Sequence, residues 1–505
     1  MSSTINLKEN KSYYLPLLLI ISIISHFPFV LKGFGEIDAT KIAVSVIDIL
    51  NHGSNAAFAN FYFTDVIPLY ILYLKWAMKL LNFDYSYLPL VMNYTNAVFG
   101  TLTVIPAFFL VRQLFRNSAI AFCSVLALIF APSFYQSAIM GFPHLIALFF
   151  LLLSLIFYLS GLDHGHKRTV FLLMFLSCVF LTITFLFKSD YVLAGGAYIG
   201  FLFMRKVRDK GKIAGAFLIV IISGVLFFLL RYLILGTTGG TTMSGAGMSK
   251  WFDYFFIGDS ISLAFLKWQI KPIIYCAGIV TFCLGLISLI YFMVKRRIDI
   301  LIFIMSWTAA PTFLWFIIHG NNARHNMLSV LPILVMIVFL FYERFGRYAI
   351  VLTVMLILGN YFVTAPSSSI LRPSGNLFKS NDLLESRMIE LHSRVQEIVN
   401  LDENKIVVLG YFHNPHVIFE ILRSALSYEA VKIGREDYKI QIGNKEYVFI
   451  YFVVADPKDI DKDIDNVLNK YNLRDHLFVS ATYDLQSLNK LGLKTKTLKI
   501  IKAAL

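Results

Sequence analysis

The sequence has little charge. Asp, Glu, Lys and Arg make up only 15% of its 505 residues, whereas a soluble domain carries about 25%. Hydrophobic residues make up 57%, and they come in blocks of about 18–25, the length that crosses roughly 30 Å of hydrocarbon. This composition excludes an ordinary soluble protein and predicts a polytopic α-helical membrane protein.

Cysteine is also scarce. All four cysteines fall inside apolar blocks without the spacing of metal ligands: Cys123, Cys178, Cys276 and Cys283. A disulfide framework or a cysteine zinc site is therefore excluded, and we expect buried thiols that pack as small hydrophobes. Sparse cysteine and the absence of an endoplasmic-reticulum retrieval signal favour a prokaryotic plasma (inner) membrane.

The first apolar block, 13–31, lacks a small-residue cleavage site and is predicted to be a retained span. About eleven spans are expected, at 13–31, 88–111, 118–136, 142–160, 169–187, 190–205, 213–235, 272–294, 299–318, 326–342 and 347–364. They form a predicted transmembrane domain, 1–365, followed by a soluble domain, 366–505.

The net charge of +14 is concentrated in short loops between the apolar blocks. These loops carry Arg112, Arg116, Lys167, Arg168, Arg205, Lys206, Arg208, Lys210, Lys212, Lys295, Arg296, Arg297, Arg344 and Arg347. This placement argues against a nucleic-acid partner and, by the positive-inside rule, makes that side cytoplasmic together with the N-terminus. With an odd number of spans, the C-terminal domain is expected on the extracytoplasmic side.

Two outer segments precede the tail. The first, 32–87, is predicted to hold two helices at the membrane surface, the second ending near Leu81 with Lys75 and Lys79 in the interface. The second, 236–271, opens with glycine and threonine and predicts a loop. A lid over a membrane-surface site and an ordinary linker are both compatible with it.

The tail alternates strand-like runs, 405–412 and 447–455, with helical runs, 383–399, 416–426 and 460–471. This pattern predicts a small extracytoplasmic α/β domain. Three polar residues follow its first strand: Tyr411, His413 and His416. Ligand binding and ordinary loop polarity explain them equally well, and acceptor recognition is the more natural role for the domain.

Two acids follow the first span directly, Glu36 and Asp38. A helix over 38–53 would place Ala39, Ile42, Ala43, Val46, Ile49 and Leu50 on one face and Asp38, Lys41, Ser45, Asp48 and His52 on the other. Such a helix would lie flat on the outer leaflet. Asp38 either caps it or acts as a base on an acceptor hydroxyl at the lipid boundary. Glu36 is a partner, a substitute or a solvated carboxylate.

Three short motifs then occur in an order that resembles the GT-C glycosyltransferases. The acid after the first span precedes Ile49-Leu50-Asn51-His52-Gly53 and Pro68-Leu69-Tyr70. Phe187-Lys188-Ser189-Asp190 resembles the family's basic residue followed by an acid, and Ala323-Arg324-His325 resembles its Arg-His entry to a late span. The resemblance covers 10–365 and is strongest to the branch of protein mannosyltransferases, aminoarabinose transferases and RgtA-like enzymes.

The resemblance implies a sugar transfer from a polyprenyl-phosphate donor to a lipid, glycan or protein acceptor on the non-cytoplasmic face, with inversion. It makes Asp38 the general base, with Glu36 nearby, and places Arg324, Lys188, His325 and His144 at the donor phosphate. The chain departs from the branch at Val66-Ile67-Pro68, where aminoarabinose transferases have Lys-Pro-Pro, and at His144, near which many relatives carry an acid. No cofactor is implied with certainty, although a divalent metal is compatible.

Each candidate also has a structural reading. Lys188 at a span end would extend its ammonium to the interface, Arg324 would anchor the same boundary, and the two histidines would be structural. A transporter or flippase for a lipid-linked sugar is a rival function, but transporters carry charge or helix breaks at mid-span. An O-antigen ligase or polymerase is another, although it depends on a long outer loop rich in Arg and His.

Overall fold

The computed structural model describes residues 13–31, 33, 37–52, 67–238, 263–317 and 323–364, together with six strands between 405 and 503. The backbone of Asp38 is described and its side chain is not, whereas Glu36 lies outside the described residues. Several other predicted features also lie outside the described residues. They are the tail helices, the aromatic and glycine-rich parts of the predicted outer loops, and Tyr411, His413 and His416.

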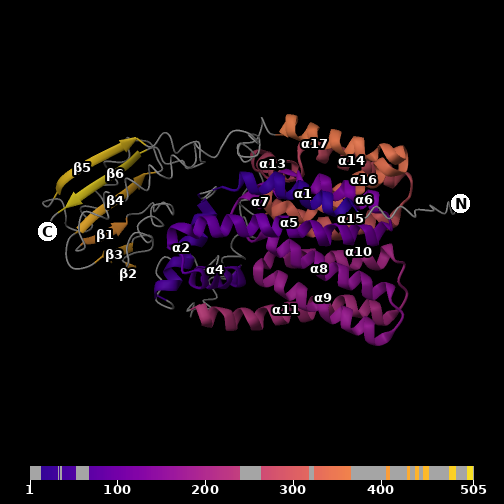
Figure 1. Ribbon diagram of the computed structural model, residues 1–505, viewed down its shortest axis with the longest axis horizontal. Coiled ribbons are helices and arrows are strands. Elements are labelled where there is room, and N and C mark those ends of the chain that lie inside the picture. The colour runs from indigo at the N-terminus through magenta and orange to yellow at the C-terminus, as the bar shows by residue number, and fades with distance from the viewer. Residues whose placement is uncertain are drawn as a thin grey trace.

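Most of the described chain is helical, and the helices run side by side in one elongated bundle (Figure 1). The helices are α1 (Tyr14–His26), α2 (Ile37–His52), α4 (Pro68–Leu81), α5 (Leu88–Phe115), α6 (Ser118–Ile129), α7 (Pro132–Ile139), α8 (His144–Asp163), α9 (Lys167–Phe187), α10 (Gly196–Met204), α11 (Lys210–Thr238), α13 (Leu263–Ala277), α14 (Ile279–Val294), α15 (Ile298–Ile317), α16 (Val330–Phe345) and α17 (Ala349–Thr364). Two 3₁₀ helices, η4 (Ser189–Gly195) and η5 (Ala323–Ser329), lead into α10 and α16.

Several helix ends follow from local sequence. The Asn117 side chain accepts hydrogen bonds from the Ala119 and Ile120 amides at 2.8 and 3.1 Å, as an N-cap does. Pro68 opens α4, where its missing N–H leaves no hydrogen bond unmade, and Asn82 closes it in the left-handed conformation at φ 48°. Gly346, at φ 53°, ends α16 before α17 begins. These signals are short-range, so the sequence predicts them well.

Five described helices are long and apolar enough to cross a membrane, or seven if each of two bent helix pairs counts as one span. The bent pairs are α6 with α7, at 61°, and α13 with α14, at 93°. Three shorter apolar helical stretches accompany them, at Tyr14–Phe29, Ser189–Met204 and Ile298–Phe313. Each predicted span overlaps a helix, so the polytopic helical architecture is confirmed, whereas the number eleven stays a prediction.

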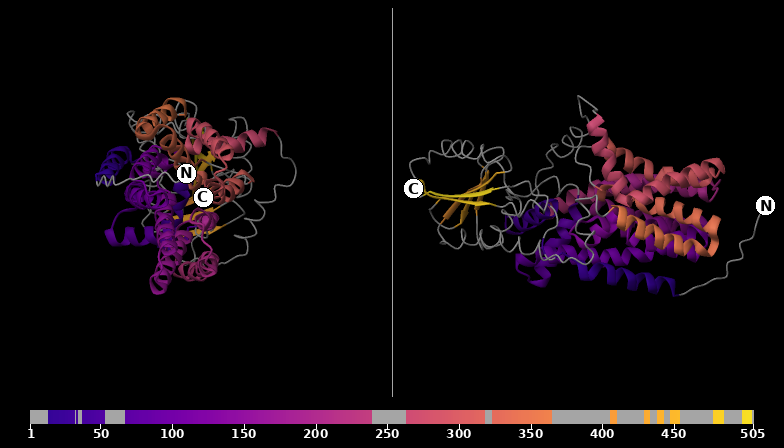
Figure 2. Two further views of the ribbon diagram at one scale, coloured as in Figure 1. Left: turned by 90° about the vertical axis from the view of Figure 1, so that its right-hand side faces the viewer. Right: turned by 90° about the horizontal axis from the view of Figure 1, so that it is seen from above.

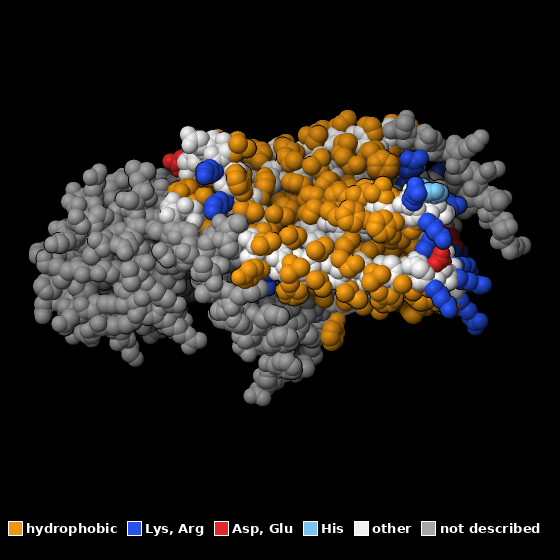
Figure 3. Space-filling view, turned by 90° about the horizontal axis from the view of Figure 1, so that it is seen from below, with side chains coloured by type: hydrophobic (Ala, Val, Ile, Leu, Met, Phe, Trp, Pro, Cys, Tyr) orange, Lys and Arg blue, Asp and Glu red, His pale blue; other side chains and the backbone are white. Residues whose placement is uncertain are grey.

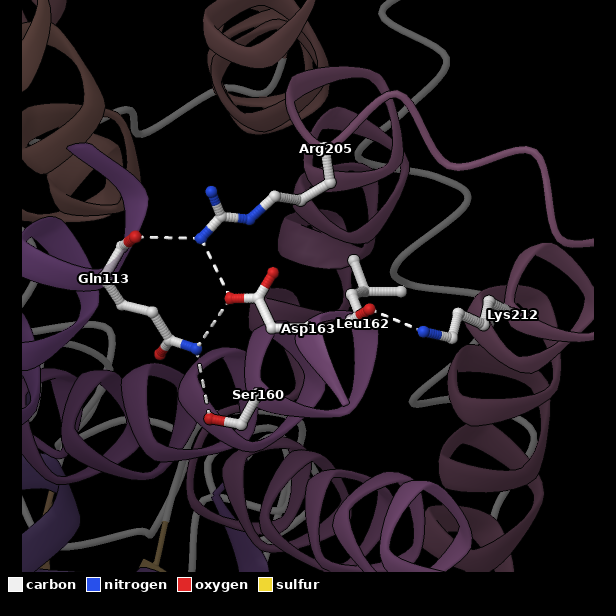
Figure 4. Close-up of polar contacts among 6 residues, drawn as sticks. All are labelled: Gln113, Ser160, Leu162, Asp163, Arg205 and Lys212. Carbon is white, nitrogen blue, oxygen red and sulfur yellow. Dashed lines mark hydrogen bonds and ion pairs between the residues drawn. The ribbon is translucent and has the colours of Figure 1, made fainter. Parts of the chain in front are cut away.

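On the face seen from below, hydrophobic side chains cover most of the described bundle, and Lys and Arg gather at its right-hand end (Figure 3). A polar network ties the loops together at this basic end (Figure 4). An Arg205 nitrogen donates to the Gln113 backbone oxygen at 2.8 Å and to Asp163 Oδ2 at 3.0 Å, and Lys212 Nζ donates to the Leu162 carbonyl at 2.6 Å. Burial lowers the pKa of Arg205, and the neighbouring Asp163 carboxylate opposes that shift. The charge asymmetry suits the predicted orientation, which stays a prediction.

The helix predicted after the first span is present as α2, but two residues of its predicted polar face are buried. Its apolar positions apart from Leu50 are buried, and so are Ser45 and Asp48, both at 0% exposure. The expectation of a solvated face is therefore wrong for these two residues. The physical reason is that α2 does not lie alone on a flat surface but packs with α4 in a folded layer.

The C-terminal strands form one six-stranded sheet in the order β2-β3-β1-β4-β6-β5, beyond one end of the helical bundle (Figure 2). The strands are β1 (Lys405–Leu409), β2 (Glu429–Lys432), β3 (Tyr438–Ile442), β4 (Tyr447–Val453), β5 (Leu477–Asp484) and β6 (Thr497–Ala503). The two strand-like runs of the sequence correspond to β1 and β4, which are parallel neighbours, whereas every other pairing is antiparallel. A parallel pair needs a long crossover connection, and its predicted helical form stays a prediction.

Candidate donor-phosphate site

The site lies at the end of α8 opposite the basic network. α8 begins at His144 and ends at Asp163, so its 20 residues separate the two ends by about 30 Å. Three further segments reach the His144 end: the exit of α1, the start of α5, and η5. Residues distant in the sequence are therefore neighbours here.

Arg324, at the start of η5, is 4% exposed and lies over the Phe142 ring with 4.2 Å between its guanidinium carbon and the ring centroid. This is a cation–π contact, in which the negative face of the ring attracts the cation. Such a platform fixes the plane of the guanidinium. A bidentate contact to two phosphate oxygens has this geometry.

Two imidazoles lie beside this cation. The rings of His144 and His325 have centroids 5.7 Å apart, and the Phe142 ring packs edge-on against His144 at 5.8 Å. Neither ring nitrogen of His144 has a hydrogen-bond partner among the described residues, although the side chain is buried. Unsatisfied buried polar atoms are rare in folded proteins and point to a ligand, an ion or water.

Lys188 completes the group from the end of α9. Its Nζ lies 3.0 Å from Asp190 Oδ1, with side-chain exposures of 7% and 3%, and it is near enough to His144 and His325 for its charge to act on both. Next to Asp190, the Tyr191 hydroxyl donates to the His144 carbonyl at 2.9 Å, which holds η4 against the start of α8. The C-terminal end of a helix favours a cation, which suits Lys188 after α9.

An apolar cavity of about 410 Å³ lies between α13, α14, α15 and α16. Its walls are mainly hydrophobic, and η5 contributes Asn326 and Ser329 to them. The short η5 segment therefore carries Arg324 and His325 at the cationic group and lines the apolar cavity with the residues that follow. A ligand with an anionic head and an apolar tail fits this arrangement.

All four predicted phosphate-binding residues, Arg324, Lys188, His325 and His144, thus come together from three separate parts of the chain. The predicted base is placed only by its backbone, in the first turn of α2. Its distance from Arg324 is outside what the structure describes, and the roles of all six candidate residues stay predictions.

Sequence reasoning missed the aromatic platform Phe142 and two asparagines of α5, Asn93 and Asn96, which are 1% and 0% exposed. A usable signal was present for the asparagines. Two amides three residues apart in an apolar span are costly to bury, and polar residues inside spans are by default functional candidates.

Comparisons with known proteins agree with this architecture. A family model described as a domain of unknown function (DUF6311) matches residues 52–259, and no curated protein matches the chain. ArnT from Cupriavidus metallidurans bound to undecaprenyl phosphate superposes with a TM-score of 0.61 at 11% identity, covering 97% of this chain and 98% of ArnT.

The fold is that of the GT-C glycosyltransferases. The GT-C oligosaccharyltransferase of Archaeoglobus fulgidus, in complex with zinc and sulfate, also matches, at 12% identity and a TM-score of 0.48 over 81% of this chain. The chain spans 61% of the length of that enzyme. The same archaeal protein with an inhibitory peptide and a dolichol-phosphate gives a TM-score of 0.49 at 12% identity, over 82% of this chain and 64% of its own.

A divalent metal, which a GT-C fold can accommodate, would need acidic or histidine ligands. Within the described part of the chain, no three His, Cys, Asp or Glu side chains are grouped closely enough to hold one. The described residues at the site offer two cations, two imidazoles and the Asp190 carboxylate, which is paired with Lys188 at 3.0 Å. The cations and imidazoles are groups that bind an anion.

Proposed function

We propose that this protein is an inverting membrane glycosyltransferase. It moves a sugar from a polyprenyl-phosphate carrier to a hydroxyl of a lipid, glycan or protein acceptor at the extracytoplasmic face of the plasma membrane. The observation that carries the proposal is the junction at η5 of a buried cationic group with an apolar cavity. A polyprenyl phosphate has the matching chemistry, a phosphate head joined to a long hydrocarbon chain.

The donor binds with its phosphate against Arg324 and Lys188 and its first isoprene units in the cavity of α13 to α16. In this proposal His144 Nδ1 or Nε2, and a ring nitrogen of His325, donate to the remaining phosphate oxygens. A phosphate anion there forms charge-assisted hydrogen bonds with two buried cations, and such bonds are stronger in a low-dielectric interior than in water.

The chemical step is a single displacement. The acceptor oxygen attacks the anomeric carbon as Asp38 takes its proton, and the bond from that carbon to the phosphate oxygen breaks with its electron pair on the phosphate. Negative charge therefore grows on the leaving group next to Arg324 and Lys188, which stabilise the transition state more than the ground state. Attack opposite the leaving group inverts the anomeric configuration.

The test is a transfer assay in lipid nanodiscs with a panel of polyprenyl-phosphate sugars and envelope extract as acceptor. Asp38→Asn removes the base and is expected to lower kcat by about 10²–10⁴, the usual contribution of a general base, with little change in the dissociation constant of undecaprenyl phosphate. The matched control is Asp84→Asn, a carboxylate in the exposed turn after α4, which should leave both quantities unchanged.

Three results would overturn the proposal. The first is wild-type protein that transfers no sugar from any donor in the panel. The second is a wild type that fails to bind undecaprenyl phosphate. The third, an Asp38→Asn variant with full turnover, would return Asp38 to helix capping.

A further inference from the structure

Asn93 and Asn96 lie on one side of α5, near its outer start. Residues three apart on a helix are neighbours on its surface, separated by about 4.5 Å along the axis. Both are buried in a helix that otherwise fits a membrane span. Each side-chain amide donates out of α5 to the backbone of a different segment, and those two segments lead into the two halves of the proposed site.

Asn93 holds the first segment. Its Nδ2 donates to the Leu31 carbonyl at 2.6 Å and to the Gly33 carbonyl at 2.9 Å. Only the NH₂ group can face two carbonyl oxygens, so these contacts fix which way the amide points. Gly33 directly precedes the stretch that carries Glu36 and Asp38 into α2, and Asn93 therefore anchors the acidic side.

Asn96 holds the second segment. Its Nδ2 donates to the Met140 carbonyl, in the turn between α7 and α8. The next residue, Gly141, packs so closely on α5 that an added Cβ would lie 2.7 Å from Met92 Cβ and 3.0 Å from Asn93 Oδ1. The residues that follow this turn are Phe142, whose ring lies beneath Arg324, and His144 at the start of α8.

The two segments also bond each other, since the Leu31 amide donates to the Ile139 carbonyl at 3.2 Å. We call 31–33, which precedes the acids, the acidic segment, and 139–144, which carries Phe142 and His144, the platform segment. Asn93 contacts both, since its NH₂ donates to the acidic segment and its oxygen faces Gly141 of the platform segment. A polar clamp of this kind sets a distance between two backbones, because each hydrogen bond tolerates only a few tenths of an ångström.

We infer that Asn93 and Asn96 are positioning residues that set the separation between the base and the leaving group. The inference rests on the proposed function. Asn93 sets the acidic segment, so its loss should act on the chemical step, where a displacement of about 1 Å can cost 10²-fold. Asn96 sets the platform segment, which carries Phe142 beneath Arg324, so its loss should act on donor binding.

The test compares kcat, the donor KM and the dissociation constant of undecaprenyl phosphate in Asn93→Asp, Asn93→Ala, Asn96→Asp and Asn96→Ala. In Asn93→Asp a carboxylate faces two carbonyl oxygens, and kcat is expected to fall roughly 10- to 100-fold with KM and lipid affinity nearly unchanged. In the Asn96 variants the lipid dissociation constant and KM should rise roughly tenfold. The alanine variants remove the hydrogen-bond donors without adding charge. If an aspartate variant is not recovered as monodisperse protein, kcat, KM and the lipid dissociation constant are compared between the alanine variants instead.

The matched control is Thr103→Val, since Thr103 is buried on the same helix and its short hydrogen bond stays within it, to the Phe99 carbonyl at 2.6 Å, with only a long 3.4 Å contact to the Leu145 carbonyl of α8. It should change none of the three quantities beyond about twofold. Equal effects of the Asn93 and Asn96 variants on kcat and KM, or losses no larger than that of Thr103→Val, would overturn the inference. If the wild-type protein neither binds undecaprenyl phosphate nor transfers a sugar, the proposed function itself is overturned. That outcome is distinguishable from failure of the inference, because it is seen before any asparagine variant is compared.

Discussion

Two ion pairs of the same length stand near opposite ends of the bundle. Lys188 Nζ lies 3.0 Å from Asp190 at the His144 end of α8, which we call the outer end after the predicted orientation. An Arg205 nitrogen lies 3.0 Å from Asp163 at the opposite end, called the inner end. Their surroundings differ. The outer side chains are 7% and 3% exposed, and the inner ones 16% and 32%.

The two ion pairs therefore differ in interaction energy although their lengths are the same. Water and salt screen the inner pair, which also donates to backbone carbonyls and ties neighbouring loops together (Figure 4). The outer pair sits in low dielectric beside a second cation, Arg324. A buried ion pair is weak evidence for stability, and two buried cations in one place are suited to bind an anion.

Lys188→Met gives the largest expected effect, because it strands the Asp190 carboxylate in a buried environment. Removing one partner of a buried pair costs about 3–5 kcal/mol, and steric trapping in bilayers would measure this loss of unfolding free energy. The double variant Lys188→Met/Asp190→Asn should recover most of the stability, since no uncompensated charge remains, yet bind undecaprenyl phosphate weakly. If the double variant binds the lipid as wild type does, Lys188 serves the fold alone.

Arg324→Met should act on catalysis more than on stability. The loss of a charge-stabilising group at the leaving phosphate is expected to lower kcat/KM by about 10²–10³. Arg324→Lys keeps the charge but not the planar fork, and should fall between the wild type and Arg324→Met. The measurement is steady-state transfer at varied donor concentration, with the unfolding free energy as control. Equal activity of the lysine variant and wild type would show that a point charge suffices and that the fork is not used.

Much of the outer end follows from local sequence, and the rest depends on partners far along the chain. Apolar block length predicts the spans, and short motifs predict Arg324, His325, Lys188 and His144. Their proximity depends on tertiary contacts such as Phe142 with Arg324, which no local window contains. The packing of α4 against α2 is likewise a tertiary contact.

The break within the predicted span 272–294 illustrates the same limit. Gly278, at φ 96°, separates α13 from α14 at 93°, and Asn360 of α17 satisfies the backbone there. Its Nδ2 donates to Thr281 Oγ1 at 2.5 Å and to the Ala277 carbonyl at 3.4 Å, while the Thr281 amide donates to its Oδ1 at 3.2 Å. A glycine inside an apolar run is common, so the sequence alone does not distinguish a bend from a straight helix.

Phe142→Leu tests the aromatic platform and should have a smaller effect than the loss of Arg324 itself. The cation–π contact is worth about 2 kcal/mol in a desolvated setting, so its removal should weaken undecaprenyl phosphate binding by up to roughly 30-fold. Phe142→Tyr keeps the ring face and should bind almost as wild type does. Unchanged affinity in Phe142→Leu would mean that other contacts orient Arg324.

Asp163→Asn at the inner end should have the smallest effect. It is a direct comparison with Lys188→Met, because the two ion pairs have the same length. A partly exposed pair contributes about 0.2–1 kcal/mol, and asparagine keeps an oxygen that accepts from Arg205. We expect an unfolding free energy within about 1 kcal/mol of wild type, shrinking further at high salt as screening grows. Transfer activity should be unchanged, since α8 separates Asp163 from the cationic group by its whole length. A loss of activity without a loss of stability would show that the two ends of α8 are coupled.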